Sequence, residues 1–512
     1  MISQSTSPRP RSVNRTALLA LTGAGLFLAA LDAYVVVAAL EPMLFHRNSL
    51  GVPANHLERA IPLITGFLCG YLALMPLAGG LSDRFGRTRT FAAFLILFGA
   101  GSLVTATAHD VGQAVLGRVL QGAGGGALVP IALALAADLY AGPGRTPVLG
   151  GMSALQEVGS VVGPLWGGVI AAGPDDRWRW IFWLNLVFVA ALLYLAWPSV
   201  RARPMARTPR PLDLPGAFFA GAGLALLTLA LYAEDPSKSP VGSAFLWEFP
   251  LALLMFVVFA VREGRTRDPL IRLGHFRDSA FTGAALTNAI AGVGLMVALV
   301  FIPVLAQSPI FNLGSGDAAW LLFRLMLGIP VGALAGGFLA RRLGSHRAVA
   351  ALGMALAAVG LFWLSGWDQD ALHRTLPLFG LHAADLQLFA VGLGLGLEIA
   401  PVSAALLDVV GAPERGAGAS LLVVMRMLGM LVGFSALSGF GLYHFNRATA
   451  HLLPPLFSIG PDYALRYTRY LLQLRAAILD EYHVIFAVTA VIVMAGAVIA
   501  AATLRPPRPA RA

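Results

Sequence analysis

Charged residues are scarce in this chain of 512 residues: Asp, Glu, Lys and Arg together make up 12%, whereas hydrophobic residues make up 57%. About a quarter of the residues in a typical soluble domain are charged. So small a charged fraction excludes a water-soluble globular protein and indicates a membrane protein. Cysteine is nearly absent as well, since Cys69 is the only one, and this excludes an intramolecular disulfide.

Lysine is equally rare: Lys238 is the only one, so the net charge of +10 comes from arginines. Such a surplus also occurs in nucleic-acid-binding proteins, but here the arginines lie in short segments between long apolar runs. We therefore predict no nucleic-acid partner. Each apolar run is long enough to cross about 30 Å of hydrocarbon. The runs predict fourteen transmembrane helices, at 16–40, 61–81, 90–108, 113–137, 147–172, 181–199, 215–233, 245–261, 280–304, 318–340, 347–366, 385–410, 416–443 and 482–503.

Arginines concentrate on one side of the predicted membrane, in both chain ends and in the segments 84–89, 201–210 and 262–277. Basic residues in short loops favour the cytoplasmic side of a membrane. This distribution predicts that the N- and C-termini are both cytoplasmic, and an even number of spans likewise places the two termini on the same side.

One sequence pattern occurs twice. The pattern G-x-L-x-x-R-x-G-x-x-R occupies residues 79–89 and, 258 positions later, residues 337–347, each time after a predicted span. Many transporters are built from such internal repeats. We predict an all-α integral membrane fold of two six-helix halves, residues 1–200 and 280–512, joined by a basic linker with two extra spans at 201–279.

Several motifs resemble those of the major facilitator superfamily. Residues 79–89 resemble its signature loop, 116–122 (L-x-R-x-x-Q-G) its fourth-helix motif and 159–168 (G-x-x-x-G-P-x-x-G-G) its fifth-helix antiporter motif. Residues 31–36 and 178–185 resemble the fourteen-span drug:proton antiporters within it. The resemblance implies the major facilitator fold and a secondary transporter without cofactor, not an enzyme.

Within that subfamily, the chain most resembles the actinobacterial triacylglyceride exporters that work with a lipid-carrying lipoprotein, at 31–37, 156–165, 426–431 and 439–446. The resemblance implies a monomeric, proton-coupled exporter of lipophilic cargo such as triacylglyceride, surrounded by the lipids of the bacterial cytoplasmic membrane. It also implies a lipoprotein partner on the outer face. Two alternatives stay open: a multidrug:proton antiporter for amphiphilic drugs, and a scaffold that presents lipid without transporting it.

Charged residues inside spans are candidates for proton coupling, because charge in a membrane is costly and usually functional. Asp32 and Arg118 fall at similar depths in the first and fourth spans, which are neighbours in the resembled fold. A carboxylate whose surroundings alternate between apolar and cationic binds and releases a proton. The alternative is a static ion pair that fixes helix packing.

Glu157 and Arg426 form a second candidate pair, at one depth but in different halves. The resembled exporters place a functional carboxylate and arginine at these positions, where a bistable contact would open and close the halves. Support of helix packing is the alternative. Glu398, near the middle of its span, is a candidate second proton or substrate site. Arg324 lies nearer the outer surface and is expected to snorkel to the headgroups or to pair with Glu157.

The signature loop supplies a candidate conformational latch, formed by Gly79, Asp83, Arg84, Gly86 and Arg87. A carboxylate at such a junction can cap a helix N-terminus and hold basic neighbours across the interface between the halves. In the resembled family this loop stabilises one conformation.

The fifth span carries a row of small residues on one face. Gly159, Gly163 and Gly167 recur every four residues and allow another helix backbone to approach closely. Pro164 permits a kink in the same helix, and Gly168 completes the motif. Helix packing is the direct interpretation of this face, and an antiporter role rests on the resemblance alone.

Two segments outside the membrane remain. A helical extension is predicted near 447–482, with an amphipathic pattern at 462–482. It either continues the last span outward, as in the resembled exporters, or lies on the outer leaflet. Residues 367–384 form a second outer insertion, for which a hairpin is one interpretation. The histidines show no metal-ligand spacing, so we predict no metal site.

Overall fold

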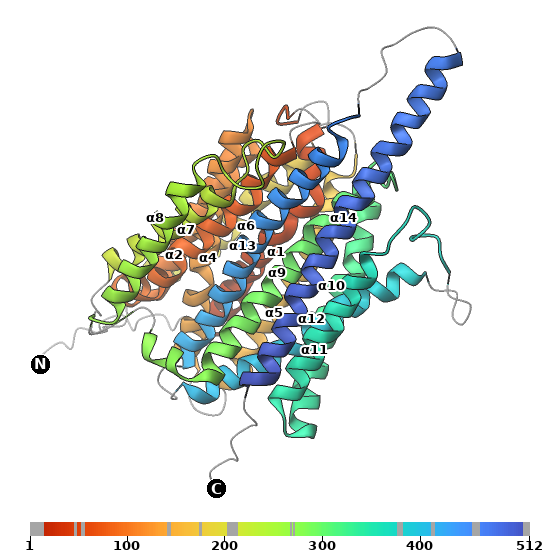
Figure 1. The fold of residues 1–512 in the computed structure, drawn as a ribbon. Coiled ribbons are helices and arrows are strands. Elements are labelled where there is room, and N and C mark those ends of the chain that lie inside the picture. The colour runs from red at the N-terminus through yellow and green to blue at the C-terminus, as the bar shows by residue number, and fades with distance from the viewer. Residues whose placement is uncertain are drawn as a thin grey trace, which may run out of the picture.

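The computed structural model describes residues 15–45, 49–52, 57–140, 145–173, 177–201, 213–266, 269, 272–375, 382–410, 415–452 and 461–504. Fourteen α-helices run through these residues (Figure 1). Their bounds are α1 Arg15–Phe45, α2 Ile61–Phe85, α3 Arg87–Ala106, α4 Val111–Leu139, α5 Arg145–Ala171, α6 Arg177–Arg201, α7 Leu214–Leu231, α8 Phe245–Glu263, α9 Ser279–Gln307, α10 Ser315–Leu343, α11 His346–Leu364, α12 Ala383–Val409, α13 Arg415–Thr449 and α14 Pro461–Thr503. Short 3₁₀ turns precede α2 and α9.

Helix ends are set by local hydrogen bonds. Asp110 and Ser345 cap α4 and α11 by accepting bonds from backbone N–H groups one turn inside, as N-cap residues do. Asp213 caps α7 through the Gly216 N–H and pairs with Arg262 of α8 at 2.8 Å. Burial alone would raise the pKa of Asp213, but the hydrogen bonds from Gly216 and Arg262 outweigh it, and the pKa falls below its usual value.

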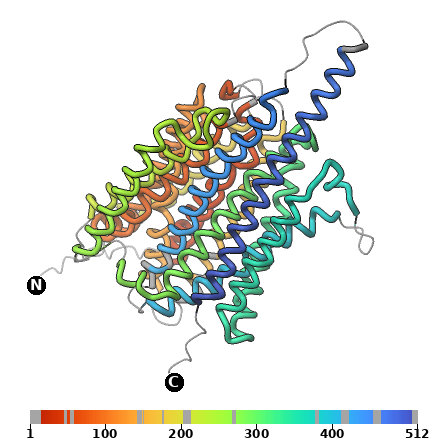
Figure 2. Tube along the Cα trace, viewed as in Figure 1, coloured from red at the N-terminus to blue at the C-terminus, as the bar shows by residue number. Residues whose placement is uncertain are grey.

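The helices form one tilted bundle (Figures 1 and 2). Helices α1–α6 pack mainly on one another, and so do α9–α14. Helices α7 and α8 pack together at the edge, where α7 contacts α2 and α13. Apolar side chains of α8 such as Leu246 and Trp247 are about four-fifths exposed, as expected of a helix that faces lipid.

The prediction of fourteen transmembrane helices agrees with the fourteen α-helices found in the described residues. Within the described residues, thirteen helices are long and apolar enough to cross a membrane, all except α5. Helix α1 begins, and α14 ends, on one side of the bundle, which we call the termini side; the opposite side is the far side (Figure 1).

The far side carries a helical extension. Helix α14 is continuous over 43 residues, about 65 Å at 1.5 Å per residue, and its first part projects beyond the bundle (Figure 1). Of the two alternatives for 462–482, the structure therefore shows a continuation of the last span. The expected hairpin at 367–384 is represented by an antiparallel bridge between Thr375 and His382; residues 376–381 lie outside the described residues.

Candidate functional site

A cluster of buried polar side chains surrounds Asp32 of α1. Asp32 is 0% exposed, and its Oδ2 lies 2.7 Å from Nη1 of Arg118 on α4. Its Oδ1 accepts hydrogen bonds from Asn185 of α6 at 2.6 Å and from Gln121 of α4 at 3.4 Å. The sequence-based expectation that Asp32 and Arg118 meet is confirmed. The two amide partners were not singled out, although both lie in the quoted motifs.

The partners of Asp32 are themselves held in place. The Gln121 amide donates to Ser102 at 2.8 Å and accepts from Thr105 and Arg118. The guanidinium of Arg118 lies 4.2 Å from the centre of the Phe67 ring. A buried charge is tolerated only when it is paired and hydrogen-bonded, and these contacts supply both kinds of partner to the buried Asp32 side chain.

A second charged cluster lies between the two groups of helices. Arg426 of α13 has its Nη2 3.4 Å from Oε1 of Glu398 on α12 and its Nη1 3.9 Å from Oε1 of Glu157 on α5. Its Nε donates to Asn288 of α9 at 3.2 Å. The expected neighbours Glu157 and Arg426 thus do meet, but Arg426 lies nearer to Glu398. Helix α1 also contacts α13 in this region, where the Tyr34 hydroxyl faces the Met430 sulfur at 3.8 Å.

Arg324 takes a different partner from the one expected. Its Nη1 lies 2.9 Å from Oδ1 of Asp385, at the start of α12. The predicted pair of Arg324 with Glu157 is wrong, because Asp385 reaches Arg324 from the neighbouring helix on the far side. The side chain of Arg324 stays partly exposed (43%), which fits the snorkelling alternative.

The signature loop forms its contacts among α2, α3 and α4. Asp83 pairs with Arg87 at 2.6 Å, and Arg87 also pairs with Asp138 of α4 at 3.1 Å. Arg87 further donates to the Gly79 carbonyl. The Arg84 guanidinium lies over the ring of Phe85. Gly86 between the two helices has φ +94°, a conformation that glycine adopts without strain. These bonds fix the junction within the N-terminal helices.

Helix α5 lies directly against the backbone of α1. A Cβ added at Gly159, Gly163 or Gly167 would come within 2.6 Å, 2.5 Å and 2.0 Å of carbonyl oxygens in α1. Pro164 lies inside this helix. At Gly168 a Cβ would lie 2.2 Å from that of Ala319, so α5 and α10 touch near the far side. The predicted glycine face is therefore a packing face.

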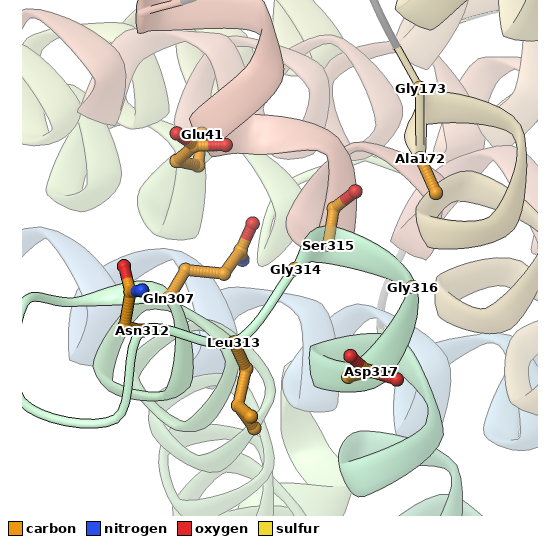
Figure 3. Close-up of a pocket in the computed structure, with 10 residues that line it drawn as sticks. All are labelled: Glu41, Ala172, Gly173, Gln307, Asn312, Leu313, Gly314, Ser315, Gly316 and Asp317. Atoms are coloured by element: carbon orange, nitrogen blue, oxygen red, sulfur yellow. The ribbon is translucent and has the colours of Figure 1, made fainter.

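A cavity of about 610 Å³ lies at the far side, between the ends of α1, α5, α9 and α10 (Figure 3). Its lining is polar and includes Glu41, Gln307, Asn312 and Asp317. It sits next to the contact of α5 with α10. His444 of α13 contacts Asp480 of α14 at 2.8 Å, which ties the α14 extension to its neighbour.

The fold is that of a multi-pass membrane protein with charged side chains buried among its helices. A sequence profile of the Major Facilitator Superfamily matches residues 22–433. A triacylglyceride transporter of Mycolicibacterium hassiacum is 37% identical, over 96% of this chain and 92% of that one. Another, of Mycobacteroides abscessus, is 39% identical over 83% of this chain and 82% of that one.

Among solved structures, the fold is similar to that of a bacterial homolog of the human lysosomal transporter Spinster. The TM-score is 0.58 at 15% identity, over 98% of this chain and 100% of that chain. The chain belongs to the major facilitator superfamily of secondary transporters.

Proposed function

We propose that the protein is a proton-coupled secondary transporter that exports triacylglyceride-like lipid across the bacterial cytoplasmic membrane. The cargo is supported by the names of its relatives, which match over most of the chain. The proton coupling is supported by one observation above all: Asp32 is a fully buried carboxylate whose partners come from two other helices.

Protonation of Asp32 weakens its bonds to the neighbouring helices. As a carboxylate, Asp32 binds Arg118 and Asn185 and so fastens α1 to α4 and α6. As a neutral acid it loses the charge-assisted part of these bonds, which are roughly twice as strong as neutral ones. Helix α1 is then freer to move. Because α5 packs closely on α1, a movement of α1 also displaces α5.

The contact of Arg426 with Glu157 is the proposed gate between the halves. We divide the chain into an N-terminal half, 1–200, a linker with α7 and α8, 201–279, and a C-terminal half, 280–512. Glu157 belongs to the first half and Arg426 to the second, 3.9 Å apart. A charge pair at this boundary is a bistable element of the kind that alternating access requires.

We place the termini side in the cytoplasm, as the arginine-rich segments suggest. The α14 extension then projects outside the cell, where an amphipathic helix can shield an acyl chain on its way to a lipid-carrying lipoprotein. The junction around Asp83 and Arg87 acts as a latch on the cytoplasmic side. The transporter works as a monomer and catalyses no covalent reaction.

The test is the lipid profile of the outer envelope of a deletion strain complemented with wild type, Asp32→Asn or Asp235→Asn, with drug susceptibility recorded alongside. Asp235 is an exposed carboxylate paired with Lys238 in a far-side loop, so Asp235→Asn is the matched control. We expect wild type and Asp235→Asn to restore neutral lipid in the envelope and Asp32→Asn to leave it inside the cell.

Two other results would replace the proposal. Unchanged lipids together with drug accumulation that depends on Asp32 would indicate a multidrug:proton antiporter for amphiphilic drugs. Full restoration of lipid export by Asp32→Asn would indicate a scaffold that presents lipid without proton coupling.

A further inference from the structure

In the second charged cluster, formed by Arg426, Glu398 and Glu157, the carboxyl group of Glu398 has an oxygen without a hydrogen bond to any described residue. The side chain is 0% exposed, and its Oε2 has no hydrogen-bond partner among the described residues. Its Oε1 has Arg426 as a neighbour at 3.4 Å, longer than a well-formed charge-assisted hydrogen bond. Burying an ionised carboxylate with one oxygen left without a hydrogen bond is costly, and burying the neutral carboxylic acid in the same place costs much less.

Arg426 is shared between two carboxylates from opposite halves. Glu398 lies in the same half, and Glu157 faces it across the boundary at 3.9 Å with a half-buried side chain. The Nε of Arg426 donates a hydrogen bond to Asn288 Oδ1 at 3.2 Å. This bond can stay in place while the two Nη atoms move between Glu398 and Glu157. One positive charge cannot neutralise two ionised carboxylates, and the cluster carries an excess negative charge that one proton removes.

Among the described residues, the titratable groups near Glu398 and Arg426 are Glu157 and two tyrosines, Tyr34 of α1 and Tyr71 of α2, the second of which interacts electrostatically with Glu157. Glu157 approaches from α5 and Tyr34 from α1, and Tyr34 contacts α13 one turn from Arg426. From α11, Gly353 lies against the backbone of Glu398, and α10 packs on α12 through backbone contacts at glycines. The proton balance of the cluster therefore depends on its two carboxylates and its one arginine.

We propose that Glu398 is a second proton-binding site of the transporter, and that its protonation transfers Arg426 from Glu398 to Glu157. This inference rests on the proposed function. A proton bound at Oε2 makes Glu398 neutral, so Arg426 is attracted only by Glu157, and the two halves are held together. Loss of that proton restores the charge of Glu398, draws Arg426 back into its own half and releases Glu157.

The first measurement is an infrared titration of the purified protein in lipid, which follows the carbonyl band of protonated carboxyl groups and needs no cargo. Exposed carboxylates have an ordinary pKa of about 4, so the titration is run above this range. The variants are Glu398→Gln, Glu398→Asp and, as a control on the same helix, Asp408→Asn, whose side chain is 44% exposed. We expect Glu398→Gln to lose one titrating component that Asp408→Asn keeps and that Glu398→Asp retains with a shifted midpoint.

The second measurement is the distance between the halves, from spin labels placed at the exposed positions Trp197 on α6 and Leu343 on α10 after replacement of Cys69. In the wild type, acidification is expected to shift this distance. Glu398→Gln, a neutral mimic of the protonated state, is expected to show the low-pH distance at every pH, and Glu398→Asp to restore the pH dependence.

An infrared titration and a distance profile of Glu398→Gln that both match the wild type would overturn the inference and leave Glu398 as part of a static ion pair. Neither readout depends on lipid export. If export proves independent of Asp32 while the Glu398-dependent shift persists, the proposed function fails and the second proton site stands.

Discussion

Replacement of Gly167 by alanine tests how closely α5 must approach α1. A Cβ at this position would lie 2.0 Å from the carbonyl oxygen of Val35, whereas atoms in ordinary contact are about 3.5 Å apart. The two backbones would have to separate by about 1.5 Å to reach that distance. Overpacking of this kind costs about 1–3 kcal/mol. We expect Gly167→Ala to be destabilised by that amount.

Gly151 provides a matched control on the same helix, because a Cβ there would meet no atom of another described helix within 4 Å. Alanine is favoured over glycine in a helix by about 1 kcal/mol, so Gly151→Ala should be unchanged or more stable. The assay is the apparent melting temperature of each variant purified in one detergent. Melting temperatures that change equally in both variants would refute the close packing of α5 on α1.

Three further variants test individual contacts. Arg118→Met leaves Asp32 as an unpaired buried charge and should cost about 3–5 kcal/mol of stability; the double variant with Asp32→Asn should recover most of the lost melting temperature, and no recovery would contradict their pairing. Asp213→Ala should weaken α7 by about 1 kcal/mol, measured as faster hydrogen exchange at its first turn. Because the pKa of Asp213 is lowered in the folded chain, its stabilisation is present above the ordinary pKa and is lost as the pH falls through the lowered value; protection of this turn, taken relative to the intrinsic exchange rate at each pH, that does not fall on acidification would contradict this. Arg324→Ala removes a partly exposed pair with Asp385, worth at most about 1 kcal/mol, so lipid export should be unchanged.

The spans were predictable because a membrane demands about 20 consecutive apolar residues, and the helices differ from the predicted ranges mostly by a few residues at each end. The last helix is the exception, since it begins at Pro461 and an amphipathic segment alone does not reveal whether it continues a span. The Asp32–Arg118 contact was predictable because depth along a helix follows from residue counting, and the resemblance placed the two helices side by side.

Residue counting fixes depth but not the direction in which a side chain points, and the remaining site contacts depend on direction. Arg324 was expected near Glu157, yet Asp385 on the adjacent helix is the nearer carboxylate. Arg426 meets Glu157 as expected, but Glu398, one helix away in the same half, is closer still. Asn185 reaches Asp32 only because α6 packs beside α1, which no local pattern in either helix specifies.

The packing of α5 on α1 gives the two charged clusters a common mechanical element. The three glycines of α5 contact the α1 backbone at Phe27, Leu31 and Val35, on both sides of Asp32. Glu157 precedes the first of these glycines by two residues on the same helix. Interiors this closely packed transmit displacement instead of absorbing it, so a shift of α1 caused by the proposed protonation of Asp32 is expected to move Glu157 relative to Arg426 as well. The half-ångström difference between the two distances from Arg426 is small enough for such a shift to reverse which carboxylate is nearer.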